Sequence, residues 1–218
     1  MHYRVRGRLI ATEFTAKPPS LASAHLLAFL NDYKRVAHAC DYGCGKLRYA
    51  GALFALADSV TLVDSPEQLD RHQLIDGHHT TVRQLAKQRW PTARIETVSQ
   101  FQVRSKPRLD FVLCASVLSA IPTRNARTRA LRAIARRLKA HGVILVVNQH
   151  TNSYYSQTAR RDDVISHLDG YLVPSNGSAS YYGILGKERT AEILTRQGYK
   201  IIEQWIEGQS NYALARIG

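Results

Sequence analysis

Two acidic residues and a pair of glycines form the part of the sequence that is best suited to chemistry. The segment Asp41-Tyr42-Gly43-Cys44-Gly45 follows an apolar run, and Asp64 ends a second apolar run about twenty residues later. Glycines allow a tight turn and let a ligand lie against the backbone. A helix that starts after such a turn offers free amides, and a carboxylate at the end of the second strand can accept hydrogen bonds from both hydroxyls of a ribose. The spacing therefore predicts a nucleoside-binding turn formed by Asp41, Gly43, Cys44, Gly45, Asp64 and Ser65.

The surrounding pattern alternates short apolar segments with amphipathic ones. Strands are predicted at 36–41, 59–64, 94–98, 109–115, 143–147, 199–205 and 211–217. Helices are predicted at 47–57, 66–88 (with Gly77 as a candidate break), 123–139 and 187–197, and a further one starts at Ser20 as its N-cap. This order predicts a doubly wound α/β fold. Its mostly parallel seven-stranded sheet would end in an antiparallel C-terminal hairpin strand.

The length of 218 residues fits one domain, which we expect to cover 1–218. Residues 1–35 are expected to form an N-terminal arm and cap helix, and 151–185, where the pattern loosens, a lid or acceptor-binding insertion. The N-terminus is charged but lacks the apolar stretch of a secretory signal. Without a long apolar run, and with three cysteines that fit reduced thiols, we expect a cytoplasmic protein that does not use a membrane.

The turn after the first strand resembles the first motif of the class I S-adenosylmethionine-dependent methyltransferases, whose fold is Rossmann-like. That motif runs acidic-x-Gly-x-Gly-x-Gly, and Asp41 to Gly45 match its first five positions, while Leu47 replaces the third glycine. The resemblance implies S-adenosylmethionine as the cofactor. It also implies that Asp41 reaches the methionine end, that Gly43 and Gly45 line the cofactor, and that Asp64 holds the ribose.

The fourth predicted strand adds to this resemblance. Residues 110–122 are similar to the family's post-strand segment, which closes over the sulfonium and carries a proline before a helix, and this implies that Cys114 and Ala115 line the cofactor. The third motif departs from the family pattern. Where an acidic residue often contacts the adenine amine, this chain has Ser99 and Gln100, so either side chain or a backbone carbonyl takes that place.

A dinucleotide and a metal ion fit the same residues poorly. A pyrophosphate site needs a third glycine where this chain has Arg48, and the carboxylate of Asp41 would repel the phosphates. Cys40 and Cys44 are four positions apart, but only one further cysteine exists and no histidine spacing completes a zinc set. We therefore expect no metal.

Methyl transfer from a sulfonium is one in-line displacement, so the enzyme mainly positions and desolvates the nucleophile. The acceptor should lie beyond the carboxyl ends of the strands, which points to Ser116, Ser119 and residues 148–155. Within this run His150 is the candidate base, Asn148 can orient an acceptor amine, and Tyr154 completes the candidate catalytic set. The competing interpretation of His150 is a loop histidine that makes one hydrogen bond.

The charge leaves the acceptor open. Thirty Lys and Arg against seventeen Asp and Glu give +13, which favours an anionic partner, although solvated charged faces explain the same number. Tyrosines and arginines between 151 and 183 could stack on a flat acceptor or simply pack the insertion. No Asn- or Asp-Pro-Pro-Tyr motif of DNA amino-methylases follows the fourth strand. Three hypotheses remain: a methyltransferase acting on nitrogen or oxygen of a small-molecule or nucleoside-like acceptor, a nucleic-acid methyltransferase, and a non-catalytic cofactor-binding module.

Overall fold

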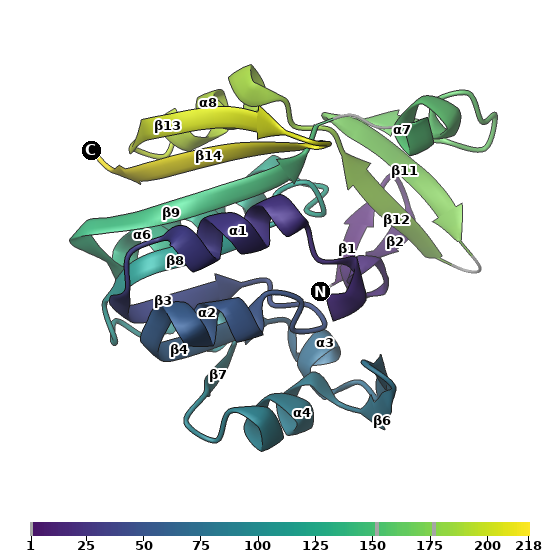
Figure 1. Cartoon of the computed structure of the whole chain (residues 1–218). Helices are drawn as coiled ribbons and strands as arrows, with labels where there is room; N and C mark the ends of the chain where they lie inside the picture. The colour runs from purple at the N-terminus through teal and green to yellow at the C-terminus, as the bar shows by residue number, and fades with distance from the viewer. Residues whose placement is uncertain (1, 151–152, 176–177) are drawn as a thin grey trace. The chain divides into compact units, whose positions relative to one another are not determined.

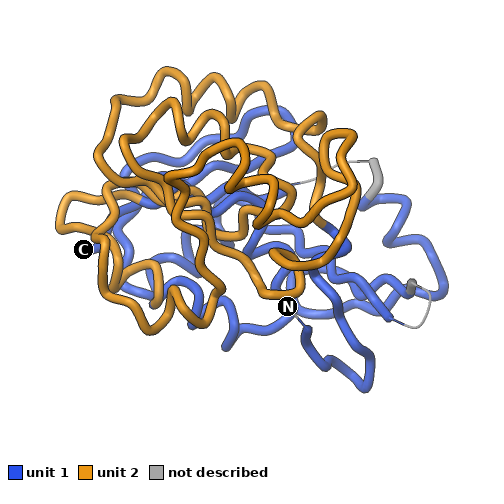
Figure 2. The backbone as a smooth tube through the Cα atoms, turned by 90° about the horizontal axis from the view of Figure 1, so that it is seen from below, with its two compact units in different colours: residues 1–15, 114–132, 144–218 blue, residues 16–113, 133–143 orange. Residues whose placement is uncertain are grey.

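The computed structural model describes residues 2–150, 153–175 and 178–218, without the side chains of Ser153, Tyr154 and Ser175. The chain divides into two compact units, each made of separate stretches of sequence (Figure 2). The first unit comprises 1–15, 114–132 and 144–218, and the second comprises 16–113 and 133–143. None of the described helices combines the length and the apolar character needed to span a membrane.

The predicted seven-stranded sheet is confirmed. Its strand order is β13-β14-β9-β8-β3-β4-β7. The pairs β3–β4, β3–β8 and β4–β7 are parallel, and the C-terminal hairpin pair β13–β14 is antiparallel. The strands are β3 (Val36–Tyr42), β4 (Ala57–Asp64), β7 (Arg94–Thr97), β8 (Leu109–Ala115), β9 (Leu138–Gln149), β13 (Tyr199–Glu207) and β14 (Ser210–Ile217).

In the second unit, helices α1 (Ala24–Asp32) and α2 (Ala50–Leu56) lie side by side over one face of the sheet (Figure 1). Helix α1 starts later than predicted because Ser23, not Ser20, is its N-cap and accepts a hydrogen bond from the Leu26 N–H. Helices α3 (Pro66–Asp70), α4 (Val82–Arg89) and α5 (Val98–Val103) also belong to this unit. The apolar runs of β3 and β4 are buried as a parallel sheet requires.

The long helix predicted at 66–88 is wrong. Between α3 and α4 the chain forms an antiparallel hairpin of β5 (Gln73–Ile75) and β6 (His78–Thr80). Its two-residue turn is Asp76-Gly77, and both residues have positive φ, 51° and 81°. Asp-Gly with two positive φ angles is the strongest short-range signal for a hairpin, and it outweighs the helical pattern around it.

The first unit contains a five-stranded sheet that the sequence did not reveal. Its order is β1-β2-β12-β11-β10, and it joins the N-terminal arm to the predicted insertion (Figure 1). These strands have three to six residues, too few for a clear alternation pattern. They are β1 (His2–Val5), β2 (Arg8–Ala11), β10 (Ile165–His167), β11 (Gly170–Ser175) and β12 (Ser178–Gly183). One buried cluster holds them together: Val5, Ile10, Leu172, Ala179 and Tyr181.

Buried polar contacts fix this smaller sheet to the loop that follows β8. Arg127, in α6 (Arg124–Arg137), is 2% exposed and donates to Asp169, to the Tyr181 hydroxyl at 3.0 Å and to the Ile121 carbonyl at 3.0 Å. The Gly183 N–H donates to the Ser119 carbonyl at 2.8 Å. Because these groups are paired away from water, residues 165–175 and 178–183 are held next to residues 116–123. The remaining helices of this unit are α7 (Ser153–Thr158) and α8 (Lys187–Thr195).

Candidate active site

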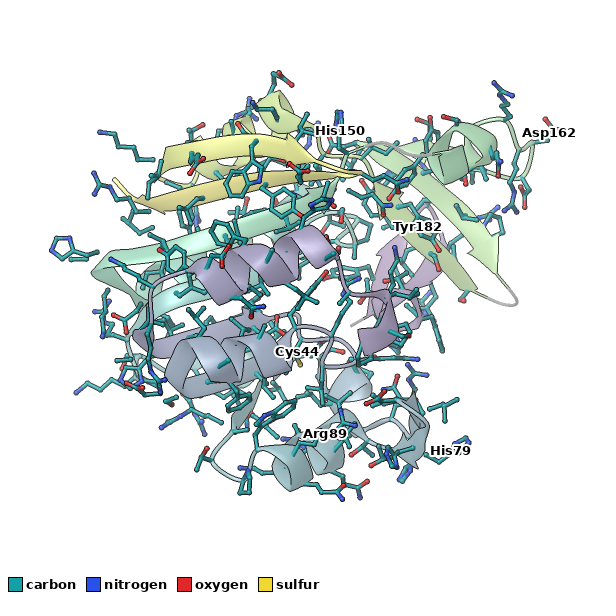
Figure 3. The ribbon with its side chains drawn as sticks, viewed as in Figure 1. Cys44, His79, Arg89, His150, Asp162 and Tyr182 are labelled. Atoms are coloured by element: carbon teal, nitrogen blue, oxygen red, sulfur yellow. The ribbon has the colours of Figure 1, made fainter. Side chains whose placement is uncertain are left out.

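The glycine turn after β3 is tied to the end of β4. The N–H groups of Gly43 and Cys44 both donate to the Val63 carbonyl, at 2.8 and 3.0 Å. Gly43 and Gly45 have φ of 85° and 54°, which side-chain-bearing residues rarely adopt. Figure 3 labels Cys44 in this loop. The turn therefore has the left-handed glycines that the motif predicted.

The position of the missing third glycine keeps a glycine-like backbone. Leu47 has φ of 65°, and its side chain is 3% exposed. A left-handed backbone costs a leucine about 1–2 kcal/mol. Burial of its side chain is worth about 1.5–3 kcal/mol, which can offset that strain. The leucine is tolerated because it fills the core beneath the turn.

The left-handed backbone at position 47 predicts that a glycine there gives a more stable protein than an alanine, the reverse of the order expected inside a helix. We expect Leu47→Ala to be less stable than Leu47→Gly by about 1 kcal/mol, because both lose the buried side chain and only alanine keeps the strain. At Ala55, an exposed position of α2, Ala55→Gly should instead lose about 1 kcal/mol. Urea denaturation of the four proteins measures both differences. A less stable Leu47→Gly would contradict the left-handed backbone.

Asp64 closes the turn from the end of β4. Its two carboxylate oxygens accept hydrogen bonds from the N–H groups of Gly45 and Ser65, both at 2.8 Å. A carboxylate only accepts hydrogen bonds, so hydroxyl donors are the kind of ligand group that suits this position. The structure thus brings Asp64, Gly45 and Ser65 together as predicted.

Gln68 is a residue of the turn that sequence reasoning missed. It is 1% exposed, and its side-chain amide donates to the Gly45 carbonyl at 2.8 Å. The Ser65 hydroxyl accepts from the Gln68 N–H at 3.2 Å, which caps α3. A serine followed three positions later by glutamine is a recognised helix-start signal. This signal agrees with the predicted helix start at residue 66, but it gives no indication that the Gln68 side chain reaches Gly45.

Asp41 is the most unusual group of the site. It is 2% exposed, and its side chain makes no hydrogen bond or ion pair with any residue that the structure describes. Burial, together with the charge of Asp64, raises its pKa to about 7, while Arg48 acts in the opposite direction. Burial also raises the pKa of the Cys44 thiol, which therefore stays protonated. A buried carboxyl with a strongly raised pKa is typical of a functional site.

Ser99 and Gln100 follow the next strand of the sheet. Asp64 of β4 lies opposite Thr97 of β7, and both predicted residues are exposed in the first turn of α5. The side-chain oxygen of Gln100 accepts from the Thr97 N–H at 2.9 Å, in a capping box. The side-chain NH₂ group of Gln100 donates to no described residue, so it can donate a hydrogen bond to a ligand.

β8 carries Cys114 and Ala115 at its carboxyl end. Asp41 of β3 pairs with Leu113 of β8, and Cys114 and Ala115 continue that strand with 0% and 8% exposure. Ser116 follows with a φ of 61° and donates its N–H to the Val147 carbonyl at 2.7 Å. A non-glycine residue in this conformation is strained, and such strain often accompanies functional loops.

The predicted catalytic residues lie in the first unit, at the end of β9 and after it. Asn148 is fully buried, with its amide nitrogen 3.4 Å from the Thr190 hydroxyl and its oxygen without a partner among the described residues. His150 donates its backbone N–H to the Gln209 carbonyl, and its Nδ1 is buried and unpartnered within the same described set (Figure 3). The side chain of Tyr154 lies outside the described residues.

Two tyrosines of the predicted insertion lie next to each other in the first unit. The Tyr155 hydroxyl donates to the Gln149 side-chain oxygen at 3.1 Å, and its ring meets that of Tyr182 edge-on, with centroids 6.4 Å apart. Tyr155 of α7 is 5% exposed and packs inside the unit, whereas Tyr182 of β12 is half-buried.

Metal ligands do not cluster in the described part of the chain. No group of three His, Cys, Asp or Glu residues is placed to hold an ion there. Cys40, Cys44 and Cys114 are buried, and none of the three is in a disulfide.

Known proteins resemble this chain in both sequence and structure. A family model described as "Methyltransferase domain" matches residues 40–146. The uncharacterized protein YmfD of Escherichia coli (strain K12) is 34% identical over 214 residues, which cover 97% of this chain and 94% of that protein.

Two solved structures share the fold at low identity. One is an S-adenosylmethionine-dependent methyltransferase from Clostridium acetobutylicum, with a TM-score of 0.61, 13% identity, and coverage of 89% of this chain and 88% of that one. The other is the 1,6-didemethyltoxoflavin-N1-methyltransferase of Burkholderia thailandensis, with bound 1,6-didemethyltoxoflavin and S-adenosylhomocysteine. Its TM-score is 0.59 and its identity 16%, over 95% of this chain and 78% of that one. The chain belongs to the class I S-adenosylmethionine-dependent methyltransferase family.

Proposed function

We propose that this methyltransferase transfers the methyl group of S-adenosylmethionine to a nitrogen or oxygen of a small, flat or nucleoside-like acceptor. The observation that carries the cofactor site is the buried, unpartnered carboxyl of Asp41 beside a glycine turn. A cationic ammonium group satisfies that carboxyl, and a carboxylate at the end of β4, Asp64, suits the hydroxyl donors of a ribose. The described residues thus fit the cofactor.

Each predicted cofactor residue receives a role in this proposal. Asp41 accepts from the α-ammonium group, Asp64 accepts from the ribose, and Gly43, Cys44 and Gly45 leave backbone space beside the ligand. Ser65 holds Asp64 in place through its N–H. Ser99 or the side-chain NH₂ of Gln100 lies toward the adenine. Cys114 and Ala115 end β8 next to the sulfonium.

The acceptor chemistry needs little from the protein. The cofactor supplies an electrophilic methyl group with a good leaving group. The chain's own task is to hold the acceptor in line and to exclude water. We propose that Tyr182, which is half-buried and packs edge-on against the buried ring of Tyr155, contacts a flat acceptor. His150 would take the proton of a hydroxyl acceptor through Nε2, while an amine acceptor needs no early base.

The small-molecule acceptor agrees with a neighbour of the same fold, the 1,6-didemethyltoxoflavin-N1-methyltransferase whose structure holds 1,6-didemethyltoxoflavin. Ion pairs within the fold leave the net charge of +13 unchanged, so a nucleic-acid acceptor is the alternative that the experiment has to separate.

Methyl-labelled cofactor tests this proposal. The protein is incubated with it and either a nucleic-acid-free metabolite extract or total RNA and DNA, in low and high salt. We expect label in the metabolite fraction, with little dependence on salt. Label only in nucleic acid, lost as salt rises, would support a nucleic-acid methyltransferase. Binding of the cofactor without any labelled product would support the non-catalytic module.

Asp41 predicts a pH dependence of cofactor binding. Its pKa of about 7 means that the carboxyl is largely neutral at pH 6 and charged at pH 8. The charged form attracts the α-ammonium group, so affinity for S-adenosylhomocysteine should fall about tenfold from pH 8 to pH 6. Calorimetric titration across this range measures the effect. Asp41→Asn should bind weakly at both values, and an equally steep profile in that variant would assign the titration to another group.

A further inference from the structure

The β5–β6 hairpin is joined to the glycine turn within the second unit. The ammonium group of Lys46, the residue after Gly45, donates to the carbonyl of Leu74 in β5 at 3.3 Å. The side-chain amide of Gln68 donates to the Gly45 carbonyl at 2.8 Å, and that of Gln73 donates to the Gln68 carbonyl at 3.3 Å. The hairpin and the turn are therefore linked by two separate routes.

Arg71, which lies between α3 and β5, orients the two glutamine side chains. Its Nη2 donates to the side-chain oxygen of Gln68 at 3.4 Å and to that of Gln73 at 3.1 Å. The two glutamines are 1% and 7% exposed, so these contacts are shielded from water. A side-chain amide has one acceptor end and one donor end. Because the guanidinium holds the acceptor end of Gln68, the NH₂ group is the end that faces Gly45.

The hairpin itself is anchored in the second unit. Ile75, the last residue of β5, is fully buried. Asp76, in the two-residue turn, pairs with Arg89 of α4 at 2.7 Å, and Figure 3 labels this arginine together with His79 of β6. The side chain of Gln73 is thus presented to Arg71 from an element that is fixed at its own turn.

Gly45 connects the Gln68 amide to the carboxylate of Asp64. The C=O of Gly45 accepts from Gln68, and its N–H donates to a carboxylate oxygen of Asp64 at 2.8 Å. Its φ of 54° lies in the left-handed region, and a glycine backbone is the least restricted of all, so neighbouring contacts have to select this conformation. A rotation of the Gly45 backbone that breaks one of these hydrogen bonds also displaces the group that makes the other.

We propose that Arg71 and Gln68 are positioning residues for the ribose of the cofactor. Arg71 fixes the amide of Gln68, and this amide fixes the backbone of Gly45. Gly45 in turn orients the carboxylate of Asp64 toward the ribose hydroxyls. This inference rests on the proposed cofactor site and extends its support to the β5–β6 hairpin. A carboxylate that is oriented in advance binds without a further ordering cost, and a misplacement of about 1 Å loses much of that gain.

Two ligands that differ only in the ribose hydroxyls test the proposal. S-Adenosylhomocysteine has both hydroxyls, and its 2′,3′-dideoxy analogue has neither. Calorimetry gives the affinities of both for wild type, Gln68→Met, Arg71→Met, Arg71→Lys and the control Arg35→Met, which removes a surface ion pair of the same unit. The ratio of the two affinities is the ribose preference. Thermal unfolding confirms that each variant is folded, and the half-buried Arg71 still gives a result if Gln68→Met does not fold.

We expect wild type to prefer S-adenosylhomocysteine about a hundredfold, as two hydrogen bonds to a carboxylate imply. In Gln68→Met and Arg71→Met this preference should fall to about tenfold, through a loss of affinity for S-adenosylhomocysteine and not for the dideoxy analogue. Arg71→Lys keeps a donor and should recover part of the preference, and Arg35→Met should change nothing.

Two results would overturn the proposal in distinguishable ways. If Gln68→Met and Arg71→Met weaken both ligands equally, or weaken neither, wild type keeps its ribose preference and only the positioning role is refuted. If wild type itself binds both ligands equally well, the assignment of Asp64 to the ribose is wrong, and the positioning role is refuted with it.

Discussion

Replacing Asp64 with alanine is expected to weaken the binding of S-adenosylhomocysteine about a hundredfold. Two hydrogen bonds from ribose hydroxyls to a carboxylate are each worth about 1.5 kcal/mol or more, and 1.4 kcal/mol is a factor of ten. The substitution also leaves the N–H groups of Gly45 and Ser65 without their acceptor. The lost hydrogen bonds to the ribose and the unpaired N–H groups both weaken ligand binding at the turn. Calorimetry or equilibrium dialysis measures the dissociation constant.

Asp58 provides the matched control because it lies at the opposite end of the same strand. Its carboxylate pairs with Arg35 at the surface, where the two side chains are 64% and 70% exposed. Asp58→Ala should leave ligand affinity unchanged. Asp64→Asn separates the two roles of Asp64, because its side-chain oxygen can still accept one hydrogen bond while the charge is lost. An Asp64→Ala protein that binds as tightly as wild type, with its fold intact, would refute the ribose assignment.

The glycine turn after β3 was predictable because its signals are local. Glycines with positive φ, a carboxylate at each strand end and apolar runs between them are set by neighbouring residues. The departure at Leu47 was visible as well, but its consequence was not. Whether a leucine is excluded or accommodated in a left-handed backbone depends on the core under the turn, which only the folded chain reveals.

The smaller sheet was not predictable because its contacts are distant in sequence. Strand β2 of the arm meets β12 through the pair Ile10 and Ala179, a separation that no local pattern encodes. Arg127 is a further example. In the sequence it belongs to an arginine-rich helix and fits a solvated face, yet it is 2% exposed and binds Asp169. A buried arginine is identified by its acidic partner, and that partner lies far along the chain.

A second buried arginine, Arg137, pairs with an acid of β7 in the second unit. Glu96 of β7 is fully buried and accepts from Arg137 at 3.0 Å and from Arg104 at 3.1 Å. Arg137 is also fully buried, lies 4.4 Å from the ring centroid of Phe101 and donates to the Pro107 carbonyl. One of its terminal nitrogens has no partner among the described residues. Arg137 therefore depends on Glu96 for its charge balance.

Glu96→Gln is expected to lower the free energy of unfolding by about 3–5 kcal/mol, because it leaves the guanidinium of Arg137 buried without a counter-charge. That loss is a large share of the stability of an ordinary domain, about 5–15 kcal/mol. The surface pair gives the control: Asp58→Asn should cost less than about 1 kcal/mol. The double variant Glu96→Gln/Arg137→Met should recover much of the loss, because an apolar side chain against Phe101 needs no partner. Urea denaturation measures all three. If Glu96→Gln costs no more than Asp58→Asn, the ion pair of Glu96 and Arg137 does not stabilise the fold. Other contacts would then hold the end of β7, where Thr97 lies opposite Asp64.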